Sequence, residues 1–172
     1  MTPEFSRIVD RHQIAAAPLA IAATEKERAA LAARFGLVRI DRLETTVTLI
    51  ADGDTVDAKG TLHAAWVQSC AISGEDLPQQ TNEPISLRFV PGGENHGTEE
   101  EIELSASDHA RDDIHYTGTG FDLGEAVAQS LALAVDPFAA GPGAESARQS
   151  AGLAGEGPSG PFAALSGLKL GK

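Results

Sequence analysis

Residues 38–68 read VRIDRLETTVTLIADGDTVDAKGTLHAAWVQ, and this stretch decides the fold. Apolar and polar residues alternate on both sides of Asp52-Gly53, which is the period of a strand with one buried face. An Asp-Gly pair between two such runs indicates a tight hairpin turn. The stretch therefore predicts a long antiparallel hairpin, in which Gly60 marks a bulge or a bend. One face of the second strand carries Val56, Ala58, Leu62, Ala64 and Trp66.

A helix is predicted before the hairpin, over residues 24–35. Thr24 is followed three residues later by Glu27, the spacing of a capping box, in which each residue binds the backbone of the other. Gly36 stands where a helix ends on a left-handed residue.

A second helix is predicted over residues 122–135, again from local signals. Asp122 and Glu125 repeat the capping spacing, and apolar residues follow at helical intervals. Asp136-Pro137 ends the helix, because the residue before a proline avoids helical backbone angles. Shorter strands or extended segments are predicted at residues 4–9, 85–90 and 101–104.

These elements predict an α+β domain over residues 1–138, with an antiparallel sheet around the long hairpin and two helices packed against it. Residues 139–172 are rich in glycine, alanine and proline, so they bury too little apolar surface to offset their ordering entropy. We expect a flexible tail there. Its last residues form either a short apolar docking motif or a frayed end, around Phe162, Leu165, Leu168 and Leu170.

The charge is unevenly distributed along the chain. The formal net charge is -12, yet residues 1–42 hold seven of the 13 Lys and Arg residues and only five of the 25 acids. A nucleic-acid-binding face is therefore expected only in the N-terminal third, if the cations gather there; a solvated surface is the alternative. The candidate basic face consists of Arg28, Arg34, Arg39 and Arg42.

Three further features bear on the compartment. No window approaches the roughly 18 consecutive apolar residues of a membrane span. The N-terminus lacks the basic and apolar blocks of a secretory signal, and one cysteine, Cys70, cannot form an internal disulfide. The expectation is a cytoplasmic protein in which Cys70 is a small core residue.

Enzymatic motifs are scarce. The segment DHARDDIH, residues 108–115, holds the best candidate metal ligands, since His109, Asp112 and His115 suit a divalent cation. A metal-dependent hydrolase is therefore one alternative, and a solvated acidic loop is the other interpretation of the segment. No nucleophile elbow or phosphate-binding loop is present, so no catalytic residue, metal or cofactor is predicted.

Three stretches together resemble the YceD family, the large-ribosomal-RNA-subunit accumulation proteins. They are GTLHAAWVQSCAISGEDL at 60–77, FDLGEAVAQSLAL at 121–133, and DPF at 136–138 with PGA at 142–144. The first resembles the family's strand, cysteine and acidic turn, and the second its "DLGE" helix. The match spans roughly residues 1–142, and PFAAL at 161–165 is similar to the proteobacterial branch.

The resemblance implies a non-enzymatic bacterial factor in ribosome biogenesis, which promotes synthesis, processing or stability of large-subunit ribosomal RNA. It carries over no catalytic residue. The binding positions that it implies are Trp66, Cys70, Asp122, Leu123, Gly124 and Glu125. Some relatives have a second cysteine that suits a metal, and this chain has none. Because the net charge opposes RNA binding, we expect ribosomal or assembly proteins as partners, with an adaptor unrelated to ribosomes as an alternative.

Overall fold

The structure is a computed structural model that describes residues 3–92 and 112–152. The chain divides into two compact units. The first contains residues 1–68 and 78–136, and the second contains residues 69–77 and 137–172. The fold is mixed α+β, as predicted, and no helix of the described residues has the length and apolarity to span a membrane.

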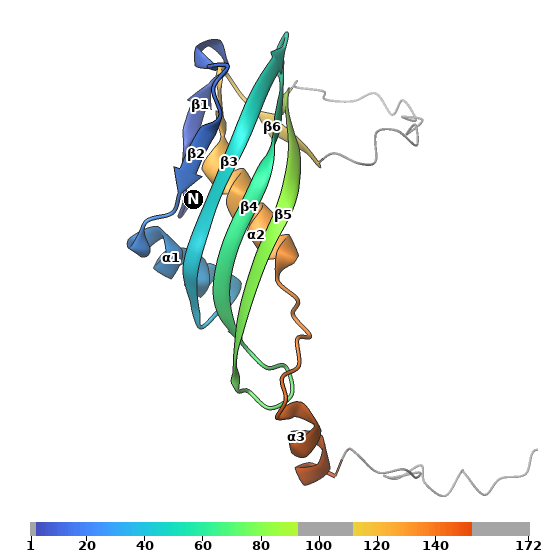
Figure 1. The fold of residues 1–172 in the computed structure, drawn as a ribbon. Coiled ribbons are helices and arrows are strands. Elements are labelled where there is room, and N and C mark those ends of the chain that lie inside the picture. Colours follow the sequence, from blue (N-terminus) through green and yellow to red (C-terminus); the bar gives the residue numbers. More distant parts are fainter. Residues whose placement is uncertain (1–2, 93–111, 153–172) are drawn as a thin grey trace, which may run out of the picture. The chain divides into compact units, whose positions relative to one another are not determined.

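A five-stranded sheet, in the order β2-β3-β4-β5-β6, dominates the first unit (Figure 1). Its strands are β2 Leu19–Ala22, β3 Arg39–Asp52, β4 Thr55–Ser69, β5 Asp76–Pro91 and β6 Asp112–Tyr116. The predicted hairpin is confirmed as β3 and β4, which pair antiparallel around Gly53 with its φ of +60°. The sheet is not purely antiparallel, because β6 runs parallel to β5.

The bulge of the hairpin lies elsewhere than predicted. The register shifts between Ile40 and Arg42, whereas Gly60 pairs in continuous register with Val47. A Cβ atom on Gly60 would stand 2.0 Å from the carbonyl oxygen of Thr46, so the neighbouring strand passes too close for a side chain. Gly60 is therefore a point of close backbone approach and not a bulge.

Both predicted helices are confirmed, within a residue at each end. Helix α1 spans Glu25–Phe35, with the complete capping box at Thr24 and a left-handed Gly36 after it. Helix α2 spans Leu123–Ala134, and the Asp122 carboxylate accepts a hydrogen bond from the Glu125 N–H at its start. The two helices lie on the same side of the sheet, behind it in Figure 1.

A separate two-stranded sheet joins distant parts of the chain. Strand β1 Ile8–Asp10, which overlaps the extended segment predicted at 4–9, pairs antiparallel with β7 Gly120–Asp122. A single 3₁₀ turn, η1 Arg11–Gln13, follows β1. This pairing holds the N-terminal segment beside the start of α2.

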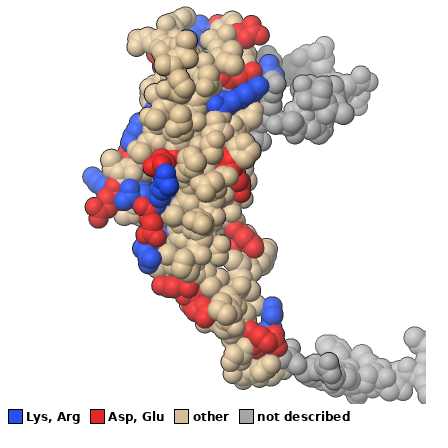
Figure 2. All heavy atoms as spheres, viewed as in Figure 1, with Lys and Arg blue, Asp and Glu red and all other residues tan. Residues whose placement is uncertain are grey.

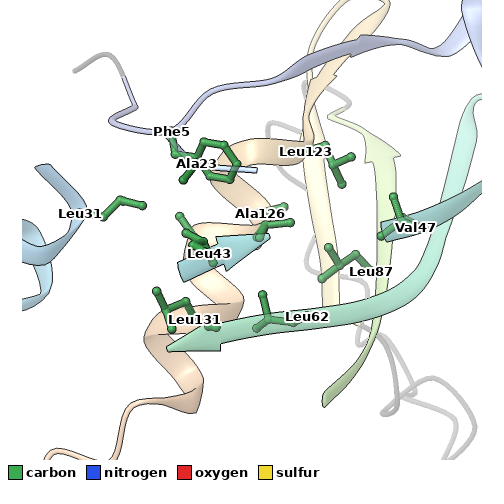
Figure 3. Packing of buried hydrophobic residues seen from close by; sticks show 14 of the residues in the cluster. Phe5, Ala23, Leu31, Leu43, Val47, Leu62, Leu87, Leu123, Ala126 and Leu131 are labelled. Atoms are coloured by element: carbon green, nitrogen blue, oxygen red, sulfur yellow. The ribbon is translucent and has the colours of Figure 1, made fainter. Parts of the chain in front are cut away.

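The core lies between the five-stranded sheet and the helices (Figure 3). The inward residues predicted on the second strand of the hairpin are buried, Leu62 among them, and so is Val47 of the first strand, whereas Val38 at its start is exposed. Leu123, Val127 and Leu131 of α2 belong to the same core cluster. Burial of this apolar surface is the main stabilising contribution, at about 25 cal/mol per Å². Phe5 of the N-terminal segment is also completely buried in this cluster.

Within the second unit, residues 139–152 depart from the prediction of a flexible tail over residues 139–172. Helix α3, Ala144–Ser150, forms within it, and Ala144 is buried against Cys70 and Leu77. The reason is non-local, since residues 69–77 supply the packing surface and hydrogen bonds that the tail's composition lacks. Residues 153–172, with the predicted docking motif, and the strand predicted at 101–104 lie outside the described residues.

Candidate functional site

The DLGE residues form a joint between the N-terminal segment and α2. The Asp122 carboxylate accepts hydrogen bonds from the Glu125 N–H at 3.1 Å, the Arg7 N–H at 2.8 Å and the Ser6 hydroxyl at 2.6 Å. One side chain therefore caps the helix and fixes a segment 115 residues away in the chain.

The next two residues allow that segment to cross the helix closely. Leu123 is completely buried, and its N–H donates to the Arg7 carbonyl at 3.0 Å. A Cβ atom on Gly124 would stand 2.8 Å from both the Arg7 nitrogen and the Phe5 carbonyl oxygen. Only glycine fits without a backbone shift at this crossing.

Glu125 completes the joint through an arginine of α1. The Arg34 guanidinium donates to both Glu125 oxygens, at 2.9 and 3.0 Å, and to Glu4 at 2.9 Å. This two-bond geometry fixes the last turn of α1 against the first turn of α2. The four DLGE positions thus have partners within the chain's own fold, which assigns each of them a structural role.

A related contact, between Arg7 and Glu27, has no signal in the sequence motifs. The Arg7 guanidinium donates to both Glu27 oxygens, at 2.7 and 2.9 Å. The pKa of Glu27 is lowered to about 2, first by these bonds from Arg7 and then by those from Thr24. The capping-box spacing identifies Glu27, but Arg7 becomes its partner only through the tertiary fold.

Trp66 is a buried member of a polar relay at the end of β4. Its indole N–H donates to Gln68 at 2.8 Å, and the Gln68 amide donates to the Asp136 carbonyl at 2.6 Å. Trp66 is 4% exposed and Gln68 is 5% exposed. Because both polar groups are satisfied inside, the relay secures the chain where it leaves α2 and offers no surface for a ligand.

Cys70 lies in the second unit, within a tight loop that collects backbone donors around its sulfur. The Sγ atom accepts hydrogen bonds from the N–H groups of Ser73 at 3.3 Å, Gly141 at 3.4 Å and Ile72 at 3.5 Å. These bonds, those from Ser73 above all, lower the pKa of the thiol to about 6, although burial acts in the opposite direction. The prediction of a buried cysteine is confirmed, and the sequence analysis did not predict the lowered pKa of its thiol.

Glu75 holds the two chain segments of the second unit together. Its carboxylate accepts the Gly143 N–H at 2.8 Å, and a Cβ atom on Gly141 would stand 2.4 Å from the same carboxylate. The Gly-Pro-Gly turn at 141–143 is therefore wrapped around a single acidic side chain. A backbone bond from the Ala71 N–H to the Ala139 carbonyl, 3.0 Å long, adds to this connection.

The four arginines of the candidate basic face are all engaged within the chain. Arg34 binds Glu125 and Glu4, Arg39 pairs with Asp41 at 2.9 Å, and Arg42 pairs with Glu44. Arg28 instead donates to the carbonyls of Ala23 at 2.8 Å and Ile40 at 3.1 Å. Three of the four charges are therefore compensated by acids, which weakens their attraction for phosphate.

A groove of about 500 Å³ runs between α1 and the start of β3, beside Arg28 and Arg39. Three alanines of α1, Ala29, Ala32 and Ala33, line it, and Glu25 and Asp41 contribute negative charge to the lining. The lining thus balances two cations with two anions, and no charge of one sign dominates the groove.

The candidate metal ligands are only partly visible. His109 and the side chain of Asp112 lie outside the described residues, while His115 is exposed on β6. Within the described residues, no three His, Cys, Asp or Glu side chains converge in a group that could hold a metal ion.

No family model matches this chain, and neither a curated protein nor a solved structure matches it.

Proposed function

We propose that this protein is a non-enzymatic factor of bacterial ribosome biogenesis that promotes synthesis, processing or stability of large-subunit ribosomal RNA. The observation that carries the proposal is the occurrence of three YceD-like stretches, at 60–77, 121–133 and 136–144, in the family's order within one chain. The proposal implies a cytoplasmic protein.

The contacts of these stretches support the proposal at the level of the fold. Asp122, Gly124 and Glu125 join α2 to the N-terminal segment and α1, and Cys70 organises the loop that receives α3. Residues with such roles are the ones that a shared architecture requires, so their presence favours a shared scaffold.

The electrostatics favour protein contacts over direct RNA contacts. The net charge is -12, and three arginines of the candidate basic face are compensated by neighbouring carboxylates. Phosphate binding depends on uncompensated Lys and Arg that release counterions. We therefore infer that the protein acts on the RNA indirectly, through ribosomal or assembly proteins.

Sucrose-gradient fractionation of cells that carry or lack the protein tests this function. The expected result is a shortage of large subunits in the cells that lack it, with the protein itself in pre-ribosomal fractions. A normal ratio of large to small subunits, with the protein only at the top of the gradient, would refute the assembly role and favour an adaptor unrelated to ribosomes.

A further inference from the structure

One face of the five-stranded sheet is covered by α1 and α2, and along the middle of β3 and β4 no helix or strand of the described residues covers the other (Figure 1). Buried and exposed residues alternate along β3, where Val47 and Leu49 face the core while Thr46 and Thr48 are exposed. The register places Thr46 beside Thr61 and Thr48 beside Lys59 of β4. We call this outward side of β3, β4 and β5 the open face.

The middle of the open face is built from short, mostly uncharged side chains. Thr46, Thr48 and Thr61 lie there, and Ser86 of β5 is exposed beside the buried Leu87. Figure 2 views this side of the molecule, and most of its surface belongs to residues that are neither acidic nor basic. Burying short, stiff side chains costs less conformational entropy than burying long charged ones.

Charged residues lie toward the two ends of the open face, and several form pairs. Arg42 pairs with Glu44 near one end of β3, and Arg88 of β5 lies 3.9 Å from Asp57 of β4 near the other. A centre with few charges and a charged rim is the usual composition of a contact surface between proteins.

The same composition disfavours RNA on this face. The outward side chains of β3 and β4 include no Phe, Tyr or Trp, and their one ring, His63, is hydrogen-bonded to Asn82 of β5. Lys59 is the one cation among the central threonines. Single-stranded RNA on a sheet requires aromatic stacking platforms and a positively charged track. A protein is therefore the better occupant.

The area of the open face suits a protein interface of ordinary size. Strands β3, β4 and β5 contain 14, 15 and 16 residues. At about 3.3 Å per residue and about 4.8 Å between strands, they offer roughly 700 Å². A standard interface buries about 800 Å² on each partner. The flanking strands β2 and β6 supply the remaining area.

The net charge decides which protein fits. Two copies of a chain with net charge -12 repel each other at long range, whereas a cationic protein is attracted and its association is accelerated. We propose that the open face is the docking surface for a cationic ribosomal protein. This inference rests on the proposed function and names the surface and the partner through which it is exercised.

The test measures binding of the full chain to purified large-subunit ribosomal proteins, immobilised one at a time. Thr48→Arg and Thr48→Glu each place a long charged side chain in the centre of the face. We expect both to weaken binding by about tenfold or more, because a buried centre tolerates neither charge. Ser86→Arg provides the same test from β5, and thermal unfolding verifies that each variant folds.

Ala132, which is exposed on α2, provides the matched control. Ala132→Arg and Ala132→Glu change the net charge by the same amounts on the other side of the first unit, so they should leave the affinity nearly unchanged. If Thr48→Glu strengthens binding and Thr48→Arg weakens it no more than Ala132→Arg does, the attraction is only long-range and the docking surface is refuted.

Other outcomes also contradict the inference. It fails if no ribosomal protein binds the wild type, if RNA occupies the face, or if sedimentation shows dimers that the Thr48 variants dissociate.

Failure of the docking surface is distinguishable from failure of the proposed function. Cells lacking the protein test the function, whereas cells carrying Thr48→Arg test the surface. A shortage of large subunits in the first and a normal profile in the second would refute only the docking surface.

Discussion

Gly124 shows how a single hydrogen atom in place of a side chain permits the fold. Residues 5–7 cross the first turn of α2 so closely that a Cβ atom would stand 2.8 Å from two backbone atoms of the segment. Backbone atoms cannot rotate away as the end of a side chain can, so the crossing requires glycine at this position.

We predict that Gly124→Ala destabilises the protein by about 1–3 kcal/mol, the usual cost of overpacking. Helix propensity alone predicts the opposite sign, since alanine is favoured over glycine by about 1 kcal/mol. Urea denaturation measures the change. Ala132→Gly, on the exposed side of the same helix, measures propensity without the crossing, and a Gly124→Ala protein as stable as wild type would contradict the steric argument.

Cys70 provides a second prediction at the scale of one residue. We expect its thiolate absorbance to appear with a midpoint near pH 6, because backbone N–H groups and Ser73 stabilise the anion. Ser73→Ala, which removes the hydroxyl, should move the midpoint upward. A wild-type midpoint near the ordinary value of about 8.5 would show that the loop does not stabilise the thiolate.

Because the pKa of Cys70 is lowered in the folded chain, its contribution to the free energy of unfolding depends on pH. The unfolded thiol ionises near its ordinary value, so between pH about 6 and about 8.5 the unfolded chain binds more protons than the native one. The contribution of Cys70 is therefore fully present above the unfolded pKa, and it is lost as the pH falls through about 6.

At the scale of the elements, two arginines fix the helices and the N-terminal segment in place. Each binds both oxygens of one carboxylate, an arrangement that we call an arginine fork. Arg7 and Glu27 connect the segment to the start of α1, and Arg34 with Glu125 connects the two helices. These contacts need two elements at once, so they stabilise the arrangement of elements more than any element alone.

We predict that the Arg7–Glu27 fork makes stability sensitive to acid. The pKa of Glu27 is lowered to about 2 from 4.5, so its contribution is present above pH 4.5 and is lost as the pH falls toward 2. Glu27→Gln should lower the free energy of unfolding at neutral pH by up to about 1 kcal/mol. It should also reduce the loss of stability between pH 4.5 and 2, which we call the acid limb of the stability curve. Denaturation across this pH range measures both effects.

Glu25 is the control, since it lies in the same first turn and has no arginine partner within the described part of the chain. Glu25→Gln should leave the acid limb unchanged. An equally steep limb in Glu27→Gln would mean that other carboxylates carry the acid sensitivity.

At the scale of the whole molecule, the N-terminal segment behaves as part of the core. Phe5 is completely buried, and Ser6 and Arg7 bind Asp122. Removing residues 1–7 should therefore cost several kcal/mol, since loss of a buried phenylalanine alone costs about 3–5 kcal/mol. Thermal unfolding measures this, with removal of residues 1–2 alone as the control. An unchanged midpoint after the longer deletion would show that the segment is dispensable.

The sequence predicted those parts of the fold whose signals are local. The capping box at Thr24, the helix cap at Asp122, Gly36 and the Asp52-Gly53 turn each act over a few residues, so the hairpin and both helices are found where expected. Strands β2 and β6 were missed because their strand character depends on pairing with distant partners, such as Leu19 with Val47 and Ile114 with Phe89.

For the candidate site too, the sequence predicted some residues, while their contacts depend on the tertiary fold. The family resemblance selected Asp122, Gly124 and Glu125, but their roles required Arg7 and Arg34, which reach them only in the folded chain. The candidate basic face was predicted from the count of arginines and acids along the chain, and such a count does not show which acids lie beside which arginines in the fold. The open face was missed because alternation alone does not reveal which side of a sheet the helices leave uncovered.

The pairing of β1 with β7 has a consequence for how the chain folds while it is being translated. Ile8 is synthesised early, yet its partner Asp122 leaves the ribosome about a hundred residues later. At roughly 5–20 residues per second, the first strand waits on the order of ten seconds for its neighbour. Until then the core that receives Phe5 lacks α2, so the domain closes only after nearly all of it has been translated, and a chaperone can bind the open chain during that interval.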